Sequence, residues 1–357
     1  MNDQHEPPTQ HPNPDSDPSP TDLGCQTPDA DRNNPALQLL DQNYHNGLTA
    51  NDEHRVERVS AKAVATNTRR NYSYQWNLYA SWAHDRGIDP IPADPEQVAA
   101  YLAERAEVHN HKPATLRAAA AAISSMHKRA ELDNPCNSKQ VKHVISGATR
   151  DAGSDQKQAE GLTALAFETI IEYSRIPRRT KGGRLETPEE AIKRAAMDHA
   201  IIGLMRDALL RPSEAANLVW ADLEERDHGT GLLCIRRSKT DQEGQGFYAF
   251  VSPRTMTFLS AIRGDAQPTD SIFGLHRNQI SNRIKMAAQA AGLGDGFSGH
   301  SPRIGMAQDL AQAGTELHRL MVDGRWRTPR MPAHYIRKVS VARGAVAQYY
   351  GTFDRPS

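Results

Sequence analysis

The segment at residues 151–161 constrains the fold most, because it separates two long stretches that have helical sequence patterns. Its residues are small, polar or charged, and none of them carries a large apolar side chain. Such a composition is typical of flexible linkers between domains. The chain has 357 residues, which is more than one domain usually contains. We therefore predict two domains, at residues 58–150 and 162–357, joined by a linker at residues 151–161.

The first of these domains shows helical periodicity along its whole length. In its first helix, aromatic residues recur at a spacing of three or four, at Tyr72, Trp76 and Tyr79. This pattern ends at Gly87, a residue type that often terminates helices. A second helix begins at Pro95, which Asp94 can cap, a third follows Pro113, and a short fourth spans residues 138–148. The pattern predicts a helical bundle.

Residues 1–57 differ from the rest of the chain in charge and composition. They contain eleven acidic and two basic side chains, whereas the remaining 300 residues have a net charge of +9. They are rich in proline and polar residues, so they cannot bury enough apolar surface to offset the entropy of ordering. We predict a disordered acidic tail, which either competes with DNA for basic surfaces or aids solubility. The basic remainder favours a polyanionic partner, although an ordinary solvated surface can carry the same charge.

Three features argue against other classes of protein. The sequence has no apolar run of 18 or more residues, so no membrane span is expected. Its polar, acidic beginning lacks the positive start and apolar stretch of a secretion signal. The cysteines Cys25, Cys136 and Cys234 show neither metal-ligand spacing nor a disulfide framework. These features predict a cytoplasmic protein without a metal site or another cofactor.

The second domain is predicted to be mostly helical, with one β-hairpin. Two runs of apolar or β-branched residues, at 231–237 and 246–251, flank a polar turn. A basic loop lies between Arg175 and Arg184. Basic residues of this loop and of the third helix are either DNA contacts or ordinary solvated side chains. The candidates are Lys112, Arg117, Lys128, Arg129, Arg178, Arg179 and Lys181.

Two short segments of the second domain place a cation where an anion could bind. In residues 210–214, Leu-Arg-Pro-Ser-Glu, Pro212 suits the first position of a helix and Glu214 suits its first turn. Arg211 is therefore predicted at a helix start, where free backbone N–H groups favour an anion. In the second segment, Lys239 lies on the turn that follows the first hairpin strand.

Two further segments follow in the last fifth of the chain. Residues 299–303 read Gly-His-Ser-Pro-Arg, where the serine can cap a helix that begins at the proline. Arg303 is therefore also predicted at a helix start. Residues 324–326 read Gly-Arg-Trp, and Tyr335 follows Trp326 by nine positions. Each segment alone is a weak signal, because such residues usually lie on ordinary surfaces, in turns or in helices.

Taken together and in this order, the segments resemble the tyrosine recombinase (phage integrase) family. In that family an arginine, a lysine on a hairpin, a His-x-x-Arg segment, a histidine or tryptophan, and a tyrosine follow one another. The residues that occupy these places here are Arg211, Lys239, His300, Arg303, Trp326 and Tyr335. The resemblance covers about residues 58–350 and excludes the acidic tail.

The chemistry of these residue types agrees with cutting and rejoining of DNA strands. A tyrosyl oxygen, here that of Tyr335, can conserve the phosphodiester bond energy in a 3′-phosphotyrosine until a DNA hydroxyl attacks it. Arg211 and Arg303 can clamp the non-bridging phosphate oxygens without a metal ion, and the indole N–H of Trp326 can donate a further hydrogen bond. Tyr349 and Tyr350 are rival nucleophiles, but they lack the spacing from Trp326.

The remaining polar residues have supporting roles in this hypothesis. Lys239 is the best candidate for the general acid that protonates the leaving 5′ oxygen. His300 would carry a proton or donate a hydrogen bond. Glu214 would orient Arg211 or His300, or it is only a carboxylate at the start of a helix.

The resemblance implies a mainly α fold, with a helical N-terminal core-binding (SAM-like) bundle and an α-rich catalytic domain that contains a small β-hairpin or sheet. It implies site-specific recombination through a Holliday junction by a homotetramer on two double-stranded DNA sites, each an inverted repeat. Residues 339–350 would form a helix that docks onto a neighbouring subunit, or packs within their own. A bacterial, phage or plasmid origin and a nucleoid location would follow. The alternatives are a catalytically silent DNA-binding protein of this fold and a type IB topoisomerase.

Overall fold

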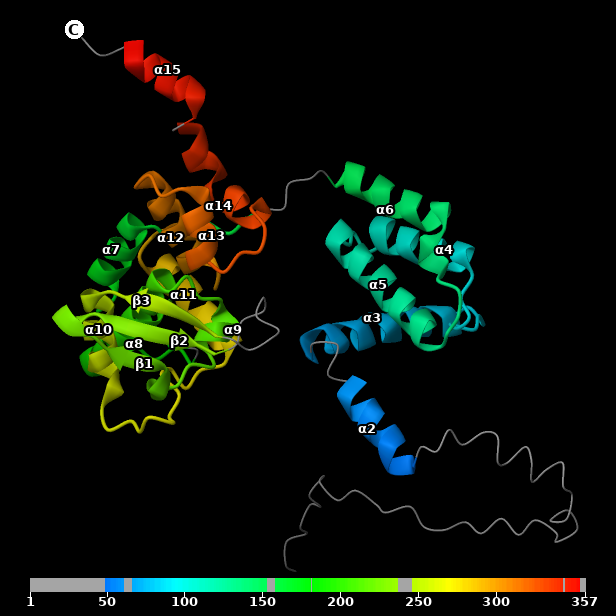
Figure 1. Cartoon of the computed structure of the whole chain (residues 1–357), viewed down its shortest axis with the longest axis horizontal. Coiled ribbons are helices and arrows are strands. Elements are labelled where there is room, and N and C mark those ends of the chain that lie inside the picture. Colours follow the sequence, from blue (N-terminus) through cyan, green and yellow to red (C-terminus); the bar gives the residue numbers. More distant parts are fainter. Residues whose placement is uncertain are drawn as a thin grey trace, which may run out of the picture. The chain divides into compact units, whose positions relative to one another are not determined.

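The computed structural model describes residues 49–60, 66–152, 158–180, 182–236, 246–342 and 344–353. They belong to two compact units, which divide the chain into Met1–Asp155 and Gln156–Ser357. The division falls inside the range 151–161 that the sequence predicts as a linker. Both units consist mainly of helices, and the second also contains a small antiparallel sheet (Figure 1). The predicted mainly α fold is confirmed.

The N-terminal unit is a bundle of helices around an aromatic and aliphatic core. Its described helices are α2 (Ala50–Ser60), α3 (Thr66–His84), α4 (Pro95–Glu107), α5 (Pro113–Arg129), the 3-10 helix η2 (Pro135–Asn137) and α6 (Lys139–Asp151). The predicted start of α4 after Asp94 is confirmed, and Ser138 caps α6 by accepting a hydrogen bond from the Val141 N–H. Tyr79, Tyr101 and Leu116 are at most 1% exposed and lie in this core.

The predicted disorder of residues 1–57 is wrong for residues 50–57, because these residues belong to helix α2. Thr49 and Asp52 cap its start reciprocally: the Asp52 N–H donates to Thr49 Oγ1 at 3.2 Å, and the Thr49 N–H donates to Asp52 Oδ2 at 3.0 Å. The prediction considered only burial of apolar surface, whereas these hydrogen bonds stabilise a helix locally. Val56 and Val59 on this helix remain more than 60% exposed. Residues 1–48 of the predicted tail lie outside the described residues.

The C-terminal unit contains helices around the small sheet. Its described helices are α7 (Ala164–Tyr173), α8 (Pro188–Asp207), α9 (Pro212–Ala215), α10 (Pro253–Arg263), α11 (Arg277–Ala290), α12 (Ser301–Gln312), α13 (Leu317–Asp323), α14 (Arg330–Ala342) and α15 (Ala345–Phe353), with the 3-10 helices η3 (Trp220–Asp222) and η4 (Asp227–Gly229).

Helix α8 forms the centre of this unit. Every residue from Asp198 to Arg206 is buried, which marks a helix surrounded by other elements. A Cβ atom at Gly203 would come within 2.9 Å of Thr255 Oγ1, so glycine permits the close approach of α10. After Asp207, the chain turns through Ala208–Leu210 into Arg211. The core of the unit therefore fixes the backbone that leads into the first predicted arginine.

The sheet confirms the predicted hairpin and adds one strand. Strands β2 (Gly231–Ile235) and β3 (Phe247–Val251) pair antiparallel, and β1 (Leu223–Glu225) pairs with the other edge of β2. The sequence pattern missed β1 because three residues are too few to show an alternation. The turn between β2 and β3, residues 237–245, lies outside the described residues and contains Lys239.

Helices α12, α13 and α14 lie together at one end of the C-terminal unit (Figure 1). Helix α12 packs against both α8 and α14. A Cβ atom at Gly305 would collide with the backbone of Leu162, so α12 also packs closely on the chain that precedes α7. This arrangement joins the end of α8 to the segments that carry the remaining candidate residues. Within the described ranges, no helix is long and apolar enough to span a membrane.

Candidate active site

Arg211 lies at the start of helix α9, as predicted. It is the N-cap residue, and Pro212 occupies the first helical turn. The carboxylate of Glu214 accepts two hydrogen bonds from Arg211: one from the backbone N–H at 2.9 Å and one from Nη1 at 2.6 Å. Local sequence therefore builds this half of the site, because a glutamate three residues after the N-cap reaches back to it.

Glu214 also binds a second arginine, Arg325. Nη2 of Arg325 donates to Glu214 Oε2 at 2.9 Å, and both side chains are at most 5% exposed. Burial alone would raise the pKa of Glu214, but the charges of Arg325 and Arg211 outweigh burial and hold that pKa below its usual range. Glu214 is therefore an ionised carboxylate between two guanidinium groups. Of the roles considered for it, the geometry fits orientation of Arg211.

Arg303 lies in the first turn of helix α12. The N-cap of this helix is His300, so Ser301 and Pro302 are its first and second residues, one position further in than predicted. The Ser301 hydroxyl does not cap the helix: it accepts a hydrogen bond from the N–H of Ser298 at 2.8 Å. A serine before a proline fits either position, so the sequence pattern could not separate them. The arginine remains at a helix start.

The guanidinium of Arg303 is 1% exposed and is held by backbone carbonyls. Nη1 donates to the carbonyl of Leu209 and Nη2 to that of Gly324. Its Cζ lies 4.3 Å from the centre of the Trp326 ring. Burial and the nearby charges of Arg211 and Arg325 lower the pKa of Arg303 to about 9. The residue is still a cation at neutral pH, and its pKa is lowered first by burial and then by the positive charges around it.

Trp326 connects Arg303 to the predicted nucleophile. The rings of Trp326 and Tyr335 pack edge to face, with centres 5.9 Å apart and an angle of 73° between planes. A side chain at Gly324 would collide with the Trp326 ring, so glycine is required two residues earlier. Tyr335 lies on α14, is partly buried, and its carbonyl accepts a hydrogen bond from Gln308 Nε2 at 3.1 Å. The structure therefore brings the arginine, the tryptophan and the tyrosine together.

His300 lies at the edge of this group and is exposed. Its backbone N–H donates to Ser298 Oγ at 3.2 Å. A Cβ atom at the preceding Gly299 would collide with Ser281 and with Pro212 of α9. This close packing brings the turn that carries His300 next to the helix that follows Arg211.

The remaining catalytic candidates divide into two groups. Lys239 lies outside the described residues. Tyr349 and Tyr350, the rival nucleophiles, lie on α15, are at least 60% exposed and pack edge to face on each other. The tyrosine that packs on Trp326 is Tyr335.

Arg325 is a residue of the site to which the sequence pattern gave no role. It lies between the predicted Trp326 and a glycine, and its side chain is 5% exposed. Its backbone has a positive φ of 56°, a conformation that residues other than glycine seldom adopt. A single arginine beside a tryptophan carries no sequence signal for either property.

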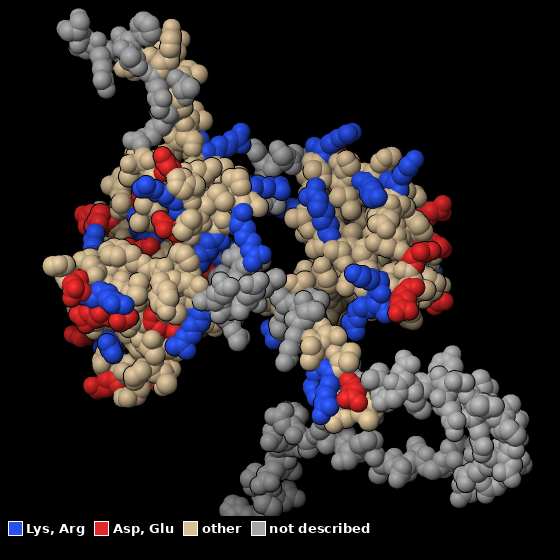
Figure 2. All heavy atoms as spheres, viewed as in Figure 1, with Lys and Arg blue, Asp and Glu red and all other residues tan. Residues whose placement is uncertain are grey.

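The candidate DNA contacts of the N-terminal unit are all exposed on α5 or directly before it. Lys112 precedes the first turn, and Lys128 and Arg129 belong to the last turn. In Figure 2, the acidic side chains of this unit gather along its right edge, and lysine and arginine gather along other edges. The exposed cations can reach phosphates without disturbing the core.

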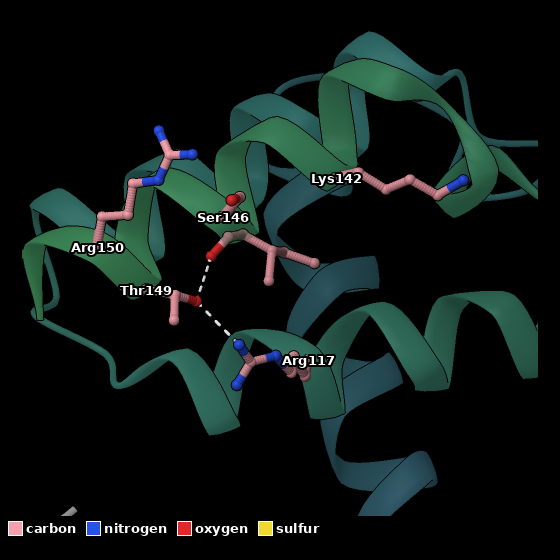
Figure 3. Close-up of a pocket in the computed structure, with 6 residues that line it drawn as sticks. Arg117, Lys142, Ser146, Thr149 and Arg150 are labelled. Atoms are coloured by element: carbon pink, nitrogen blue, oxygen red, sulfur yellow. Dashed lines mark hydrogen bonds between the residues drawn. The ribbon is translucent and has the colours of Figure 1, made fainter. Parts of the chain in front are cut away.

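Arg117 lines a hollow of about 300 Å³ between α5 and α6 (Figure 3). Its Nη2 donates to Thr149 Oγ1 at 2.9 Å, and that hydroxyl donates to the carbonyl of Ile145. Lys142 and Arg150 on α6 also line the hollow. These three cations form a second basic surface of the unit, in addition to the one at the ends of α5. Of the three, the sequence pattern predicted only Arg117 as a candidate DNA contact.

The basic loop before α8 holds its arginines differently. Arg178 is partly buried, and its Nη1 lies 3.9 Å from Oδ2 of Asp198, a carboxylate that also pairs with Arg283 at 2.8 Å. Arg179 is exposed and donates to the carbonyl of Gly183 at 3.0 Å. Lys181 lies outside the described residues. The contacts of Arg178 fit an internal ion pair better than a phosphate contact. Within the described ranges, no group of three or more histidine, cysteine, aspartate or glutamate side chains could hold a metal ion.

Comparison with known proteins matches part of the chain to a family model and most of it to two recombinases. Residues 185–340 match the model of the phage integrase family. The chain is 24% identical, over 310 residues, to an integrase/recombinase XerD homolog of Selenomonas ruminantium, which covers 80% of this chain and 86% of that protein. It is 26% identical, over 300 residues, to the recombinase Cre of Escherichia phage P1, which covers 76% of this chain and 83% of that protein.

One solved structure shows the same fold. It is the integrase of transposon Tn1549 in complex with transposon right-end DNA, with a TM-score of 0.54, 14% identity and coverage of 79% of this chain and 95% of that chain. The sequence also predicts a likeness to Cre, on residues 299–314 and on the tryptophan nine residues before the tyrosine, and this likeness is confirmed. The C-terminal unit therefore contains a phage integrase domain at residues 185–340, and the chain is similar to recombinases over most of its length.

Proposed function

We propose that the protein is a site-specific DNA recombinase that cleaves and rejoins strands with Tyr335 as its covalent nucleophile. The observation that carries the proposal is the packing of Tyr335 on Trp326, whose ring in turn lies over the guanidinium of Arg303. Among the tyrosines that the sequence makes candidates, this one packs on the tryptophan that covers a buried cation. A phosphate that reaches the tyrosyl oxygen also enters the field of these cations.

The proposed reaction proceeds by two transfers of one phosphoryl group. The Tyr335 oxygen gives up its proton to His300 or to water, attacks the scissile phosphorus and forms a 3′-phosphotyrosine while the bond to the 5′ oxygen breaks. Arg211 and Arg303 stabilise the negative charge that builds on the non-bridging oxygens. A 5′ hydroxyl of the partner strand then attacks the phosphotyrosine, and Tyr335 leaves and takes up a proton. Two such exchanges pass through a Holliday junction.

Lys239 and His300 handle the protons in this proposal. Lys239 protonates the leaving 5′ oxygen, because a lysine on a hairpin turn can follow the DNA strand. His300 donates a hydrogen bond to the phosphate or carries a proton. Its exposure and the packing of Gly299 against Pro212 support a place beside the bound strand.

We further propose that the N-terminal bundle acts as a core-binding domain and that four subunits assemble on two sites, each an inverted repeat. The exposed cations of α5 support the first part, and exposed apolar residues of α14 and α15 support the second. Val341 and Val346 are more than 70% exposed, so these helices offer an apolar surface to a neighbouring subunit. The setting would be cytoplasmic, on DNA of a nucleoid, phage or plasmid.

The test begins with selection of DNA fragments that the full chain binds from a genomic pool. Recovered sites are rebuilt as nicked suicide duplexes, in which cleavage releases a short strand and traps the covalent adduct. The wild-type protein is expected to form the adduct, whereas Tyr335→Phe binds the DNA within about two-fold and forms none. Tyr349→Phe is the matched control and should behave as wild type.

Adduct formation by Tyr335→Phe would refute the assignment of the nucleophile. Binding without any adduct, even by the wild-type protein, would favour the catalytically silent alternative. Relaxation of supercoiled DNA by a monomer without sequence preference would favour the topoisomerase.

A further inference from the structure

We propose that Arg325 is a positioning residue of the active site, which neutralises Glu214 so that Arg211 keeps both its orientation and its full positive charge for the phosphate. The inference rests on the proposed recombinase function. It concerns a residue that the family pattern does not include among the six matched positions.

The backbone around Arg325 indicates that this side chain is needed where it lies. Within the described ranges, five residues other than glycine have a positive φ, and Leu209 and Arg325 are two of them. Such conformations cost on the order of 1 kcal/mol or more and persist where the surroundings enforce them. The two residues meet, because Nη2 of Arg325 donates to the carbonyl of Leu209 at 3.0 Å. The hydrogen bond between Arg325 and Leu209 therefore joins two residues that both have an unfavourable backbone conformation.

Arg325 connects the two arginines that are proposed to hold the phosphate. On one side it shares Glu214 with Arg211, which bonds the other carboxylate oxygen through its side chain. On the other side it shares the Leu209 carbonyl with Arg303. Its Nη1 donates to the carbonyl of Ala208 at 3.1 Å. The guanidinium is thus fixed by neighbours on the turn between α8 and α9.

The ion pair between Arg325 and Glu214 changes the balance of charge around Arg211. Glu214 orients Arg211, but a carboxylate 2.6 Å from the guanidinium would also cancel much of the charge that attracts phosphate. Arg325 supplies a second cation to the same carboxylate. Three arginines and one glutamate then leave a net charge of +2 in a largely buried site, where the same group without Arg325 would have +1. A phosphate that arrives carries the compensating negative charge.

A role in the fold alone would have different consequences from a role in charge balance. Arg325 is buried, so its loss should not remove a contact with DNA. It should lower the rate of strand cleavage at saturating DNA and leave the DNA dissociation constant unchanged. A residue needed only for folding would lower the midpoint of thermal unfolding, and the cleavage rate would recover when measured well below that midpoint.

The variants for the test are Arg325→Met, which keeps the volume of the side chain, and Arg325→Lys, which keeps its charge. The control is Arg319→Met on α13, which removes an exposed cation from the same part of the chain. Single-turnover adduct formation on the suicide duplex is measured with the full chain at saturating DNA. We expect Arg325→Met to be slower by roughly 10- to 100-fold, somewhat less than removal of a direct oxyanion contact. Arg325→Lys should recover much of this loss, and the control should match wild type.

A second readout uses pH, because the charge of Glu214 depends on its cationic neighbours. Arg325 and Arg211 hold its pKa low, Arg303 lies in the same field, and the exposed turn of His300 packs beside α9. Without Arg325, less positive charge opposes the effect of burial, which raises the pKa of Glu214. Once protonated, Glu214 no longer cancels the charge of Arg211 and the group returns to a net charge of +2, so the ratio of the Arg325→Met rate to the wild-type rate should rise as the pH is lowered from 7 to 5. Taking the ratio cancels titrations common to both proteins.

Equal cleavage rates for Arg325→Met and wild type would overturn the inference, as would a rate ratio that does not change with pH. A loss that Arg325→Lys does not reduce would also contradict it. Wild-type adduct formation separates these outcomes from the proposed function: if the wild type forms no adduct, the proposed function fails first. If it forms the adduct and the variants do not differ, only the role of Arg325 fails.

Discussion

In the C-terminal unit, Arg303 and Arg325 are at most 9% exposed and bind carbonyls and a carboxylate of their own chain, whereas Lys112, Lys128 and Arg129 of the N-terminal unit extend into solvent. The difference separates two uses of positive charge. Buried, fixed cations stabilise negative charge that develops at one place. Because they already point towards that place, little energy is needed to reorganise them when the charge develops. Exposed cations attract a polyanion anywhere along its length, and salt screens them.

Removal of a buried cation should have the largest effect. Arg303→Ala removes one hydrogen-bond donor from each of the carbonyls of Leu209 and Gly324 and removes the cation beneath Trp326. We expect adduct formation to fall by about 10³-fold or more, while DNA binding stays within a few-fold of wild type. Gel analysis of adducts and a filter-binding assay provide the two numbers. Arg319→Ala, an exposed control, should change neither, and a parallel loss of DNA binding in Arg303→Ala would contradict the division between the two regions.

Lys239 should matter for one chemical step only. Lys239→Ala is expected to slow cleavage of ordinary DNA by roughly 10²-fold or more, because the 5′ oxygen then leaves without a proton. On DNA whose 5′ leaving atom is sulfur, which leaves without protonation, the same variant should lose much less. The two rates are compared on otherwise identical suicide duplexes. Equal losses on both would show that Lys239 is not the general acid.

The buried residue His199 should make the stability of the C-terminal unit depend on pH. His199 on α8 is 7% exposed, its Nε2 lies 2.9 Å from Ser174 Oγ, and burial with the charges of Arg175, Arg254 and Arg194 lowers its pKa to about 4. A base whose pKa is lower in the folded state stabilises the fold fully above its unfolded pKa, near 6.5, and loses that contribution as the pH falls towards 4. The full difference corresponds to about 3 kcal/mol.

The measurement is the free energy of unfolding of the full chain, from urea titrations between pH 7 and 4. Wild type should lose stability over this interval, and His199→Gln, which cannot take up the proton, should lose less. An equal pH dependence in both proteins would mean that His199 is not the group responsible.

Removal of one exposed cation should have the smallest effect. Arg117→Ala and Lys128→Ala are each expected to weaken DNA binding by no more than about ten-fold, similarly for all DNA sequences, and to reduce the salt slope by about one. Cleavage at saturating DNA should stay at the wild-type rate. Titrations at several salt concentrations test this, and a cleavage defect that persists at saturation would place these residues in the catalytic step.

The sequence predicted the local positions of several candidate residues because the signals for those positions are local. A proline after Arg211 and a glutamate three residues along determine both the helix start and the hydrogen bonds that hold the arginine. The nine-residue step from Trp326 to Tyr335 is likewise visible in the chain. These residues come together because helix α12 packs on both α8 and α14.

The parts that the sequence did not predict depend on tertiary contacts or on very short elements. Arg325 owes its place to Glu214 and Leu209, more than one hundred residues earlier. The partial burial of Arg178 depends on Asp198 of α8, and a composition-based argument sees only a basic loop. Helix α2 forms within the stretch predicted as disordered because Thr49 and Asp52 cap it. An argument from the overall composition of residues 1–57 does not detect the effect of two individual residues.

The identity of the nucleophile is tested most directly by locating the covalent bond. Adducts trapped on the suicide duplex are digested with a nuclease and a protease, and the peptide that carries a residual nucleotide is sequenced by mass spectrometry. We expect a single modified peptide, with the nucleotide joined through a phosphodiester to the phenolic oxygen of Tyr335. A nucleotide on Tyr349, Tyr350 or any other residue would contradict this expectation.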